Sequence, residues 1–334
     1  MLLGRRLRHS ALALTVAVAP LLSGCALIDL LGGESSIEKS FEYLPADTFQ
    51  VLFTDADVAD DLDPSELGRY AETMEDARFN QGDVEWEAWA AWGEPGDSEQ
   101  TAAVWKVEDD TDLDALADDL EAHGYTKDRV DGRDLFSIEP SSVAEDSPYP
   151  VPLLLNVLID EDEQVVAGAP DAASLEDVAA VIGDDDDSLA DDGGFDDLLD
   201  AADDDPEVAW LTRAGFAVCL TNDRGVPQDQ RSAYADLGRP EARALFVSDD
   251  ADVRLALQFA SEDDAKDDLD AREMLLDDGI DPVTRKPYDE LGDYDLEQDD
   301  DRVVIDEDLE GSAAVAIRAE RRGGGPGVCG PEES

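Results

Sequence analysis

The chain has 334 residues and a formal charge of −62 at pH 7, because 86 residues are Asp or Glu and only 24 are Lys or Arg. This charge excludes nucleic acids and anionic lipid headgroups as partners, since both are bound through clusters of Lys and Arg. Hydrophobic residues make up 43% of the chain. That is too many for a disordered polyanion, and it predicts a folded body with carboxylates on its surface.

Lysine is rare in this chain, at five residues, and aspartate occurs in runs such as 184–187. This bias resembles that of halophilic proteins, which are exposed to concentrated salt. Repulsion between surface carboxylates opposes folding, and dissolved ions screen that repulsion more strongly as their concentration rises. We therefore expect the stability of the protein to increase with salt concentration.

The first 25 residues have the layout of a secretory signal. Arg5, Arg6 and Arg8 precede an uncharged, mostly apolar stretch over residues 10–22. That stretch is too short for a membrane-spanning helix, which needs about 20 apolar residues. It ends in the sequence Leu-Ser-Gly-Cys at residues 22–25, which has the pattern of a lipobox.

This N-terminus resembles that of prokaryotic lipoproteins. The resemblance implies that residues 1–24 are a signal peptide, and that the thiol of Cys25 receives a diacylglycerol or palmitate lipid and becomes the first mature residue. Residues 25–40 would then be the lipid anchor and its tether. The protein would lie at the cell membrane, on its extracellular face. The alternative is that Cys25 is an unmodified, buried cysteine.

The region 41–205 is predicted to be a first α+β unit, because its apolar residues alternate as in strands or recur at helical spacing. Its predicted elements are a strand at 49–54, a helix at 64–79, a hairpin of 84–92 with 101–107, a helix from 111 to 124 and a strand at 134–139. An appended hairpin at 153–167 and a helix at 174–182 follow, before the acidic stretch 184–205.

The same order of elements returns in the region 206–334. We predict a strand at 208–220, a helix at 226–237, a hairpin of 242–247 with 253–259, a helix at 261–276, and strands at 302–305 and 313–318. Strand, helix, strand, strand, helix, strand is the order of a split β-α-β unit. The predicted fold class is α+β, with two tandem ferredoxin-like (β-α-β-β-α-β) repeats, antiparallel sheets and a C-terminal tail.

Two cysteines remain if Cys25 carries a lipid. An even number of cysteines in an exported chain indicates a disulfide bond, so we predict a bridge between Cys219 and Cys329. The bridge would tie down the glycine-rich end of the chain at residues 322–329, which is expected to be flexible. Two free thiols, or a redox role for them, are the alternative.

Three tryptophans stand three residues apart, at Trp86, Trp89 and Trp92. On a strand, Trp86 and Trp92 share one face with Val84, and Trp89 points to the opposite face. Packing of these large rings in the core is the simpler interpretation. The other interpretation is an aromatic surface for a partner protein or a sugar ligand.

The mature chain is poor in residues that carry catalysis or bind transition metals. His123 is its only histidine and precedes Gly124 at the end of a predicted helix. A cationic ring at this position interacts favourably with the helix dipole, so His123 is interpreted as a capping residue. One histidine and two distant cysteines exclude a zinc site of the usual Cys and His ligands. Calcium binds carboxylate oxygens. The weak candidates for it, neither of which fits the EF-hand pattern, are the run at 160–163 and the run Asp184, Asp185, Asp186 and Asp187.

These observations predict a cell-surface lipoprotein with a non-catalytic ectodomain, in a binding or envelope-structural role. The sequence contains no nucleophile elbow, phosphate-binding loop or dinucleotide fingerprint. The predicted partners are the membrane, through the lipid anchor, and an unidentified protein or small molecule. No cofactor is predicted, with calcium as the alternative. Two other functions stay open: a secreted hydrolase that uses Asp and Glu, and a solute-binding receptor.

Overall fold

The computed structural model describes residues 35–330, apart from 57, 59–63, 76, 95–98, 145–146, 150–151, 203–204, 214–233, 249–251, 310–312 and 321. Residues from Ser35 onward form one compact unit. The folded body therefore begins within the region predicted to be a tether. Among the described helices, none has the length and apolar character needed to cross a lipid bilayer.

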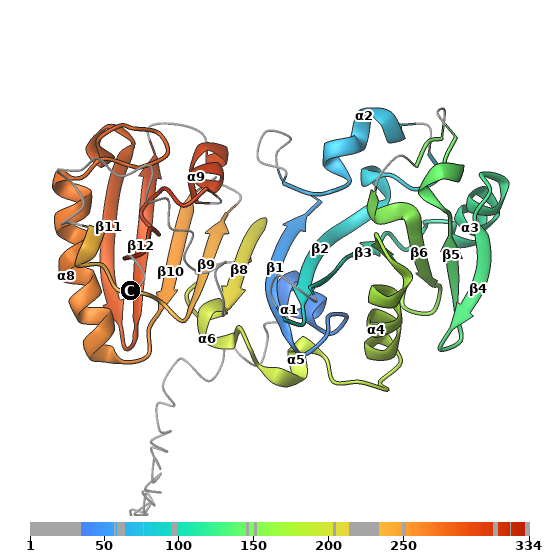
Figure 1. Ribbon diagram of the computed structural model, residues 1–334, viewed down its shortest axis with the longest axis horizontal. Helices are drawn as coiled ribbons and strands as arrows, with labels where there is room; N and C mark the ends of the chain where they lie inside the picture. The colour runs from blue at the N-terminus through green and yellow to red at the C-terminus, as the bar shows by residue number, and fades with distance from the viewer. Residues whose placement is uncertain are drawn as a thin grey trace, which may run out of the picture. The chain divides into compact units, whose positions relative to one another are not determined.

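The described residues contain one sheet of twelve strands, in which every neighbouring pair is antiparallel (Figure 1). The strand order is β11-β12-β10-β9-β8-β1-β2-β3-β7-β6-β5-β4. The strands are β1 (Thr48–Asp55), β2 (Val84–Trp92), β3 (Gln100–Val107), β4 (Thr126–Val130), β5 (Arg133–Ser137), β6 (Asn156–Asp160), β7 (Val165–Ala169), β8 (Val208–Arg213), β9 (Ala242–Val247), β10 (Val253–Gln258), β11 (Gly292–Asp299) and β12 (Arg302–Leu309).

The two halves of the sheet repeat one topology. In the first half, β1, β2 and β3 form a meander, helix α3 (Leu113–Ala122) follows, and the later strand β7 pairs with β3. In the second half, β8, β9 and β10 form a meander, helix α8 (Glu262–Asp278) follows, and β12 pairs with β10. After its last strand each half continues into a helix, α4 (Ala172–Ile182) or α9 (Ala313–Glu320). The β4–β5 hairpin has no counterpart among the described residues of the second half.

The predicted α+β class and antiparallel sheet are confirmed, but ferredoxin-like repeats are not. In a split β-α-β unit, another strand lies between the two strands that the first helix joins. Here β1 pairs directly with β2, and β8 pairs directly with β9. The boundary predicted near residue 205 falls between the two halves, yet the sheet continues across it, because Leu52 of β1 lies opposite Trp210 of β8.

Two predicted elements differ from the structure. Residues 313–318, predicted as a strand, belong to helix α9. The segment is rich in alanine, which is the strongest helix former, so it forms a helix although its apolar residues were interpreted as those of a strand. The predicted helix at 64–79 is reduced to a 3₁₀ turn and the short helix α2 (Ala71–Met74). Strand β11 was not predicted, because its alternating residues are mostly acidic and exposed.

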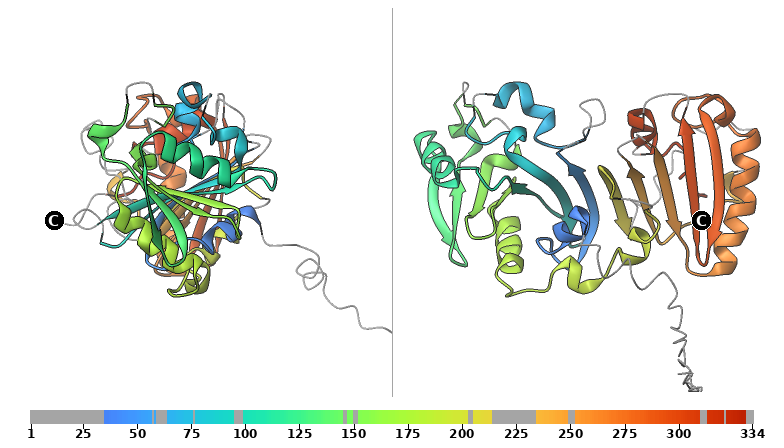
Figure 2. Two further views of the ribbon diagram at one scale, coloured as in Figure 1. Left: turned by 90° about the vertical axis from the view of Figure 1, so that its right-hand side faces the viewer. Right: turned by 180° about the vertical axis from the view of Figure 1, so that it is seen from behind.

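The sheet buries both of its faces. The α1 face, as we name it, is covered by α1 (Ser36–Phe41), α4, α5 (Leu189–Asp192) and α6 (Asp196–Leu199), and its core includes Val51, Phe53 and Trp86. The α8 face is covered by α2 and α3 in the first half and by α8 and α9 in the second, with Leu52 in its core. Helix α8 packs along β11 and β12 (Figure 2).

The glycine-rich C-terminal segment, residues 323–330, is buried rather than a flexible end. The Arg272 guanidinium, itself paired with Asp268 at 2.9 Å, donates to the carbonyl oxygens of Pro326 and Val328. The backbone N–H of Gly327 donates to Oε1 of Glu320 at 2.8 Å. Gly324, Gly325 and Gly327 lie directly against the carboxylates of Asp281 or Glu320, where a side chain would collide with them.

Candidate ligand-binding site

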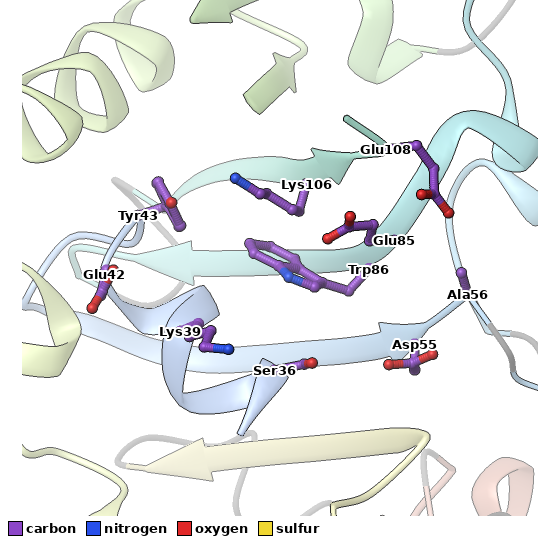
Figure 3. A pocket seen from close by; sticks show the side chains of 10 residues that line it. All are labelled: Ser36, Lys39, Glu42, Tyr43, Asp55, Ala56, Glu85, Trp86, Lys106 and Glu108. Atoms are coloured by element: carbon purple, nitrogen blue, oxygen red, sulfur yellow. The ribbon is translucent and has the colours of Figure 1, made fainter. Parts of the chain in front are cut away.

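A pocket of about 390 Å³ opens on the α1 face, at one end of β1, β2 and β3 (Figure 3). We call it the Trp86 pocket. Helix α1 forms one wall, and the ends of the three strands form the floor and the opposite wall. Its lining residues are Ser36, Lys39, Glu42, Tyr43, Asp55, Ala56, Glu85, Trp86, Lys106 and Glu108.

Helix α1 is held in place at both of its ends. Ser35 caps its N-terminus, since Ser35 Oγ accepts from the N–H of Glu38 and the Glu38 carboxylate accepts from the N–H of Ser35 at 2.7 Å. Ile37 and Phe41 are buried in the core of the α1 face. Between these anchors, Ser36 and Lys39 face the pocket.

The floor of the pocket is a pair of aromatic rings. The ring centroid of Trp86 lies 5.9 Å from that of Tyr43 and 6.3 Å from that of Phe53, in tilted geometry. Trp86 is 4% exposed, so its indole is held rigidly and only a small part of it borders the pocket. The Tyr43 hydroxyl donates to Glu163 Oε2 at 3.4 Å. Burial, followed by the nearby Glu163 carboxylate, raises the pKa of Tyr43 to about 12, so its hydroxyl stays protonated at neutral pH.

Charged side chains of both signs surround these rings. The chain has only five lysines, and two of them, Lys39 and Lys106, line this pocket. Lys106 Nζ donates to the carbonyl oxygen of Glu163 at 2.5 Å. Four carboxylates also line the pocket, from Glu42, Asp55, Glu85 and Glu108. The pocket therefore offers both cationic donors and anionic acceptors next to an apolar surface.

Glu85 carries the perturbed carboxyl group of the pocket. Partial burial raises its pKa, the neighbouring carboxylate of Glu108 raises it further, and the ammonium of Lys106 lowers it. Figure 3 shows the Glu85 side chain on the same side of the strand as the Trp86 ring and next to Glu108. The negative charge of the Glu85 carboxylate is therefore only partly neutralised by Lys106. This carboxylate can accept a hydrogen bond from a ligand hydroxyl or bind a ligand cation.

The structure separates the three tryptophans, for which core packing was the simpler interpretation and an aromatic surface the other. Trp86 lies in the pocket, and Trp92 is buried further along the same face, where its Nε1 donates to Asp177 Oδ2 at 3.0 Å. Trp89 is half-buried on the α8 face, between the cores of the two halves. A register shift between Val84 and Trp86 places Val84 on the α8 face, so the prediction that Val84 shares a face with Trp86 is wrong.

None of the other predicted site residues that the structure describes lines the pocket. Cys25 and Cys219 are outside the described residues, and Cys329 is buried in the C-terminal segment. His123 ends α3, and its ring lies 2.8 Å from the carbonyl oxygen of Asp119, as the capping interpretation predicts. Asp160 pairs with Arg133 at 2.5 Å and accepts backbone N–H groups of its own turn, so it has a structural role.

The acidic run at 184–187 lies exposed in the turn between α4 and α5. Within the described part of the chain, no three or more His, Cys, Asp or Glu side chains gather in an arrangement that could hold a metal ion. The calcium alternative therefore has no geometric support from Asp184, Asp185, Asp186 or Asp187.

No protein-family model, curated protein or solved structure matches this chain. The pocket must therefore be interpreted from its own chemistry. Sequence reasoning found Trp86 but missed Tyr43, Lys39, Lys106 and Glu85, which come from segments up to 67 positions apart in the chain. The one available signal was the scarcity of lysine, which makes the meeting of Lys39 and Lys106 unusual.

Proposed function

We propose that this protein is a cell-surface lipoprotein, anchored through Cys25, whose non-catalytic ectodomain binds a sugar ring in the Trp86 pocket. The observation that carries the proposal is the combination of a rigid aromatic floor with charged side chains of both signs around it. The lipobox at residues 22–25 supports the location.

The chemistry of a sugar ring fits this lining. A pyranose ring has apolar C–H faces, which can contact the small parts of Trp86 and Tyr43 that border the pocket. Its hydroxyl groups both donate and accept, so they pair with carboxylates such as Glu85 and with ammonium groups such as Lys39. The pocket volume of about 390 Å³ is that of a small-ligand site.

The binding proposal is tested with the full-length lipoprotein in detergent on an array of defined neutral, amino-sugar and uronic-acid glycans. We expect binding that Trp86→Ala weakens by about 10-fold or more, because the variant removes the floor. Trp89→Ala is the matched control, since Trp89 lies on the same strand and the opposite face. Circular dichroism checks that both variants fold. Absence of glycan binding, or equal loss in both variants, would contradict the proposal.

The anchor is tested separately in cells. We expect mass spectrometry of the native protein to find an N-terminal diacylglycerol on Cys25 and no residues 1–24. The variant Cys25→Ser should lose the lipid and leave the membrane fraction. An unmodified Cys25 with the first 24 residues retained would overturn the assignment of location without affecting the glycan-binding test.

Hydrolysis of a glycan is the second candidate, and the raised pKa of Glu85 beside Glu108 is the observation that favours it. A glycosidase needs a general acid with a raised pKa and a second carboxylate across the scissile bond. Binding is preferred because it needs no such pairing. New reducing ends from a bound glycan, abolished by Glu85→Gln with binding retained, would favour hydrolysis. The pocket is built from neighbouring strands of one sheet rather than between two lobes, so a solute-binding receptor is not proposed.

A further inference from the structure

A second pocket opens on the α1 face of the other half of the sheet. Its volume is about 420 Å³, and we call it the Arg254 pocket. Phe246 borders it from the same core cluster that contains Trp86. Its lining residues are Ala202, Pro206, Phe246, Ser248, Asp252, Val253, Arg254, Asp306, Glu307 and Asp308.

This pocket repeats the chemistry of the Trp86 pocket. Phe246, 4% exposed, supplies a fixed aromatic surface. The Arg254 guanidinium binds Asp306 through two hydrogen bonds, of 2.6 and 3.0 Å, and also donates to the carbonyl oxygen of Ala201 at 3.2 Å. A rigid planar guanidinium next to carboxylates offers hydrogen-bonding groups whose positions are set before a ligand arrives.

Both pockets lie at the same end of the sheet. The C-terminal end of β1 meets the N-terminal end of β8, since Thr54 lies opposite Val208. Val208 lies opposite Val247 at the end of β9, Val247 lies opposite Val253, and Val253 lies opposite Glu307 of β12. The strand ends that line the pockets therefore run in the order β3-β2-β1-β8-β9-β10-β12. At about 4.8 Å between neighbouring strands, this row is roughly 29 Å long.

We propose that the Trp86 pocket and the Arg254 pocket are two subsites of one elongated site for a linear glycan chain that crosses the sheet. The inference rests on the proposed function and extends it from one sugar ring to several. Eight acidic and three basic residues line the two pockets. Burial raises the pKa of Glu307, one of these acids, well above its ordinary value, and the other seven still outnumber the three basic residues. This charge excess disfavours uronic or sulfated glycans and selects neutral or amino sugars.

The test is the dependence of affinity on chain length. The probes are linear oligomers of glucose and of N-acetylglucosamine with one to six rings, measured calorimetrically with the full-length lipoprotein in detergent. We expect the affinity to rise by about 10-fold or more between the shortest and the longest oligomer, because the second subsite is then engaged. Galacturonic acid oligomers of equal length are expected to bind at least about 10-fold more weakly.

Ser248→Trp fills the Arg254 pocket without touching the first subsite. It should abolish the gain from chain length. Met274→Trp, which places the same side chain at a 61% exposed position of α8, is the control and should have no effect. Equal affinity for one and six rings, or full chain-length gain in Ser248→Trp, would overturn the elongated site. Loss of single-ring binding in Trp86→Ala would still support the proposed function. Absence of binding to oligomers of any length would contradict both the proposed function and the elongated site.

Discussion

The backbone N–H of Asp55 donates a hydrogen bond of 2.7 Å to the carbonyl oxygen of Glu207. Asp55 is the last residue of β1, and Glu207 stands immediately before β8. The bond extends the ladder between these strands to the end of the sheet where both pockets open. The two halves therefore share one hydrogen-bonded ladder rather than a flexible linker, and we expect them to unfold together.

Leu52→Ala tests this joint unfolding. Leu52 is buried on β1 opposite Trp210 of β8, so its truncation should lower the free energy of unfolding by about 2–4 kcal/mol. Urea denaturation followed by tryptophan fluorescence and by far-ultraviolet circular dichroism should show one shared transition. The control Met274→Ala truncates an exposed side chain and should change stability by about 0.5 kcal/mol or less. Two separate transitions would contradict the continuous sheet.

Glu87 predicts a pH dependence of stability. It is buried on β2 and accepts from the N–H groups of Glu66 and Leu67 and from Trp105 Nε1, at 2.6, 3.2 and 2.6 Å. Burial raises its pKa from 4.5 to about 7, although these three donors lower it. Because the pKa is higher in the folded state than in the unfolded chain, this contribution to stability is complete below about pH 4.5 and is lost as the pH rises through about 7.

Glu87→Gln removes this titration. The stability of the wild type minus that of the variant should fall between pH 4.5 and 7, by at most about 1.4 kcal/mol per pH unit. Thermal or urea denaturation across this range measures the difference. Asp293→Asn, at an exposed position of β11, controls for the removal of one carboxylate. A difference between wild type and Glu87→Gln that is independent of pH would rule out the assignment.

Gly325→Ala tests the packing of the C-terminal segment. Gly325 has φ +71°, and a Cβ there would lie 2.1 Å from Glu320 Oε1. Gly124 also has a positive φ, +93°, but nothing lies within 4 Å of its Cβ position. Gly124→Ala should cost about 1–2 kcal/mol from backbone strain alone, and Gly325→Ala should cost about 1–3 kcal/mol more, because the collision with a buried carboxylate is added. Equal losses would show that the segment is not tightly packed.

Salt should stabilise the protein, because its 86 acidic residues repel one another at short range. We expect the melting temperature to rise by several degrees between about 0.1 M and about 2 M potassium chloride. Identical melting temperatures at both salt concentrations would contradict the prediction.

The bridge between Cys219 and Cys329 stays a prediction, since Cys219 lies outside the described residues. Mass spectrometry of unreduced protein digests should find the two cysteines in one linked peptide pair. In the chain-entropy model, closing a loop of this length contributes on the order of 4 to 5 kcal/mol, so Cys329→Ser should lower stability by a similar amount. Alkylation of both thiols in unreduced, unfolded protein would exclude the bridge.

Local pattern was sufficient for the hairpins and for the helices α3, α4 and α8, whereas the predicted helix at 226–237 lies mostly outside the described residues. The predicted strands at 84–92 and 101–107 correspond to β2 and β3, and 242–247 and 253–259 correspond to β9 and β10. These segments are short, apolar and separated by turn residues, so neighbours along the chain are also neighbours in the sheet. The capping role of His123 was predicted for the same reason, because a helix end depends on residues within one turn.

The sequence by itself determined the lipobox pattern, the strongly acidic character, the α+β class and the antiparallel hairpins, because each depends on composition or on residues close in the chain. Only the tertiary structure decided that both halves join in one sheet through β1 and β8, and that Tyr43, Trp86 and Lys106 meet in one pocket. It also decided that a register shift turns Val84 away from Trp86 and that the terminal glycines are buried. The reason is that strand pairing and burial depend on the energy of distant segments packing together, which no local pattern contains.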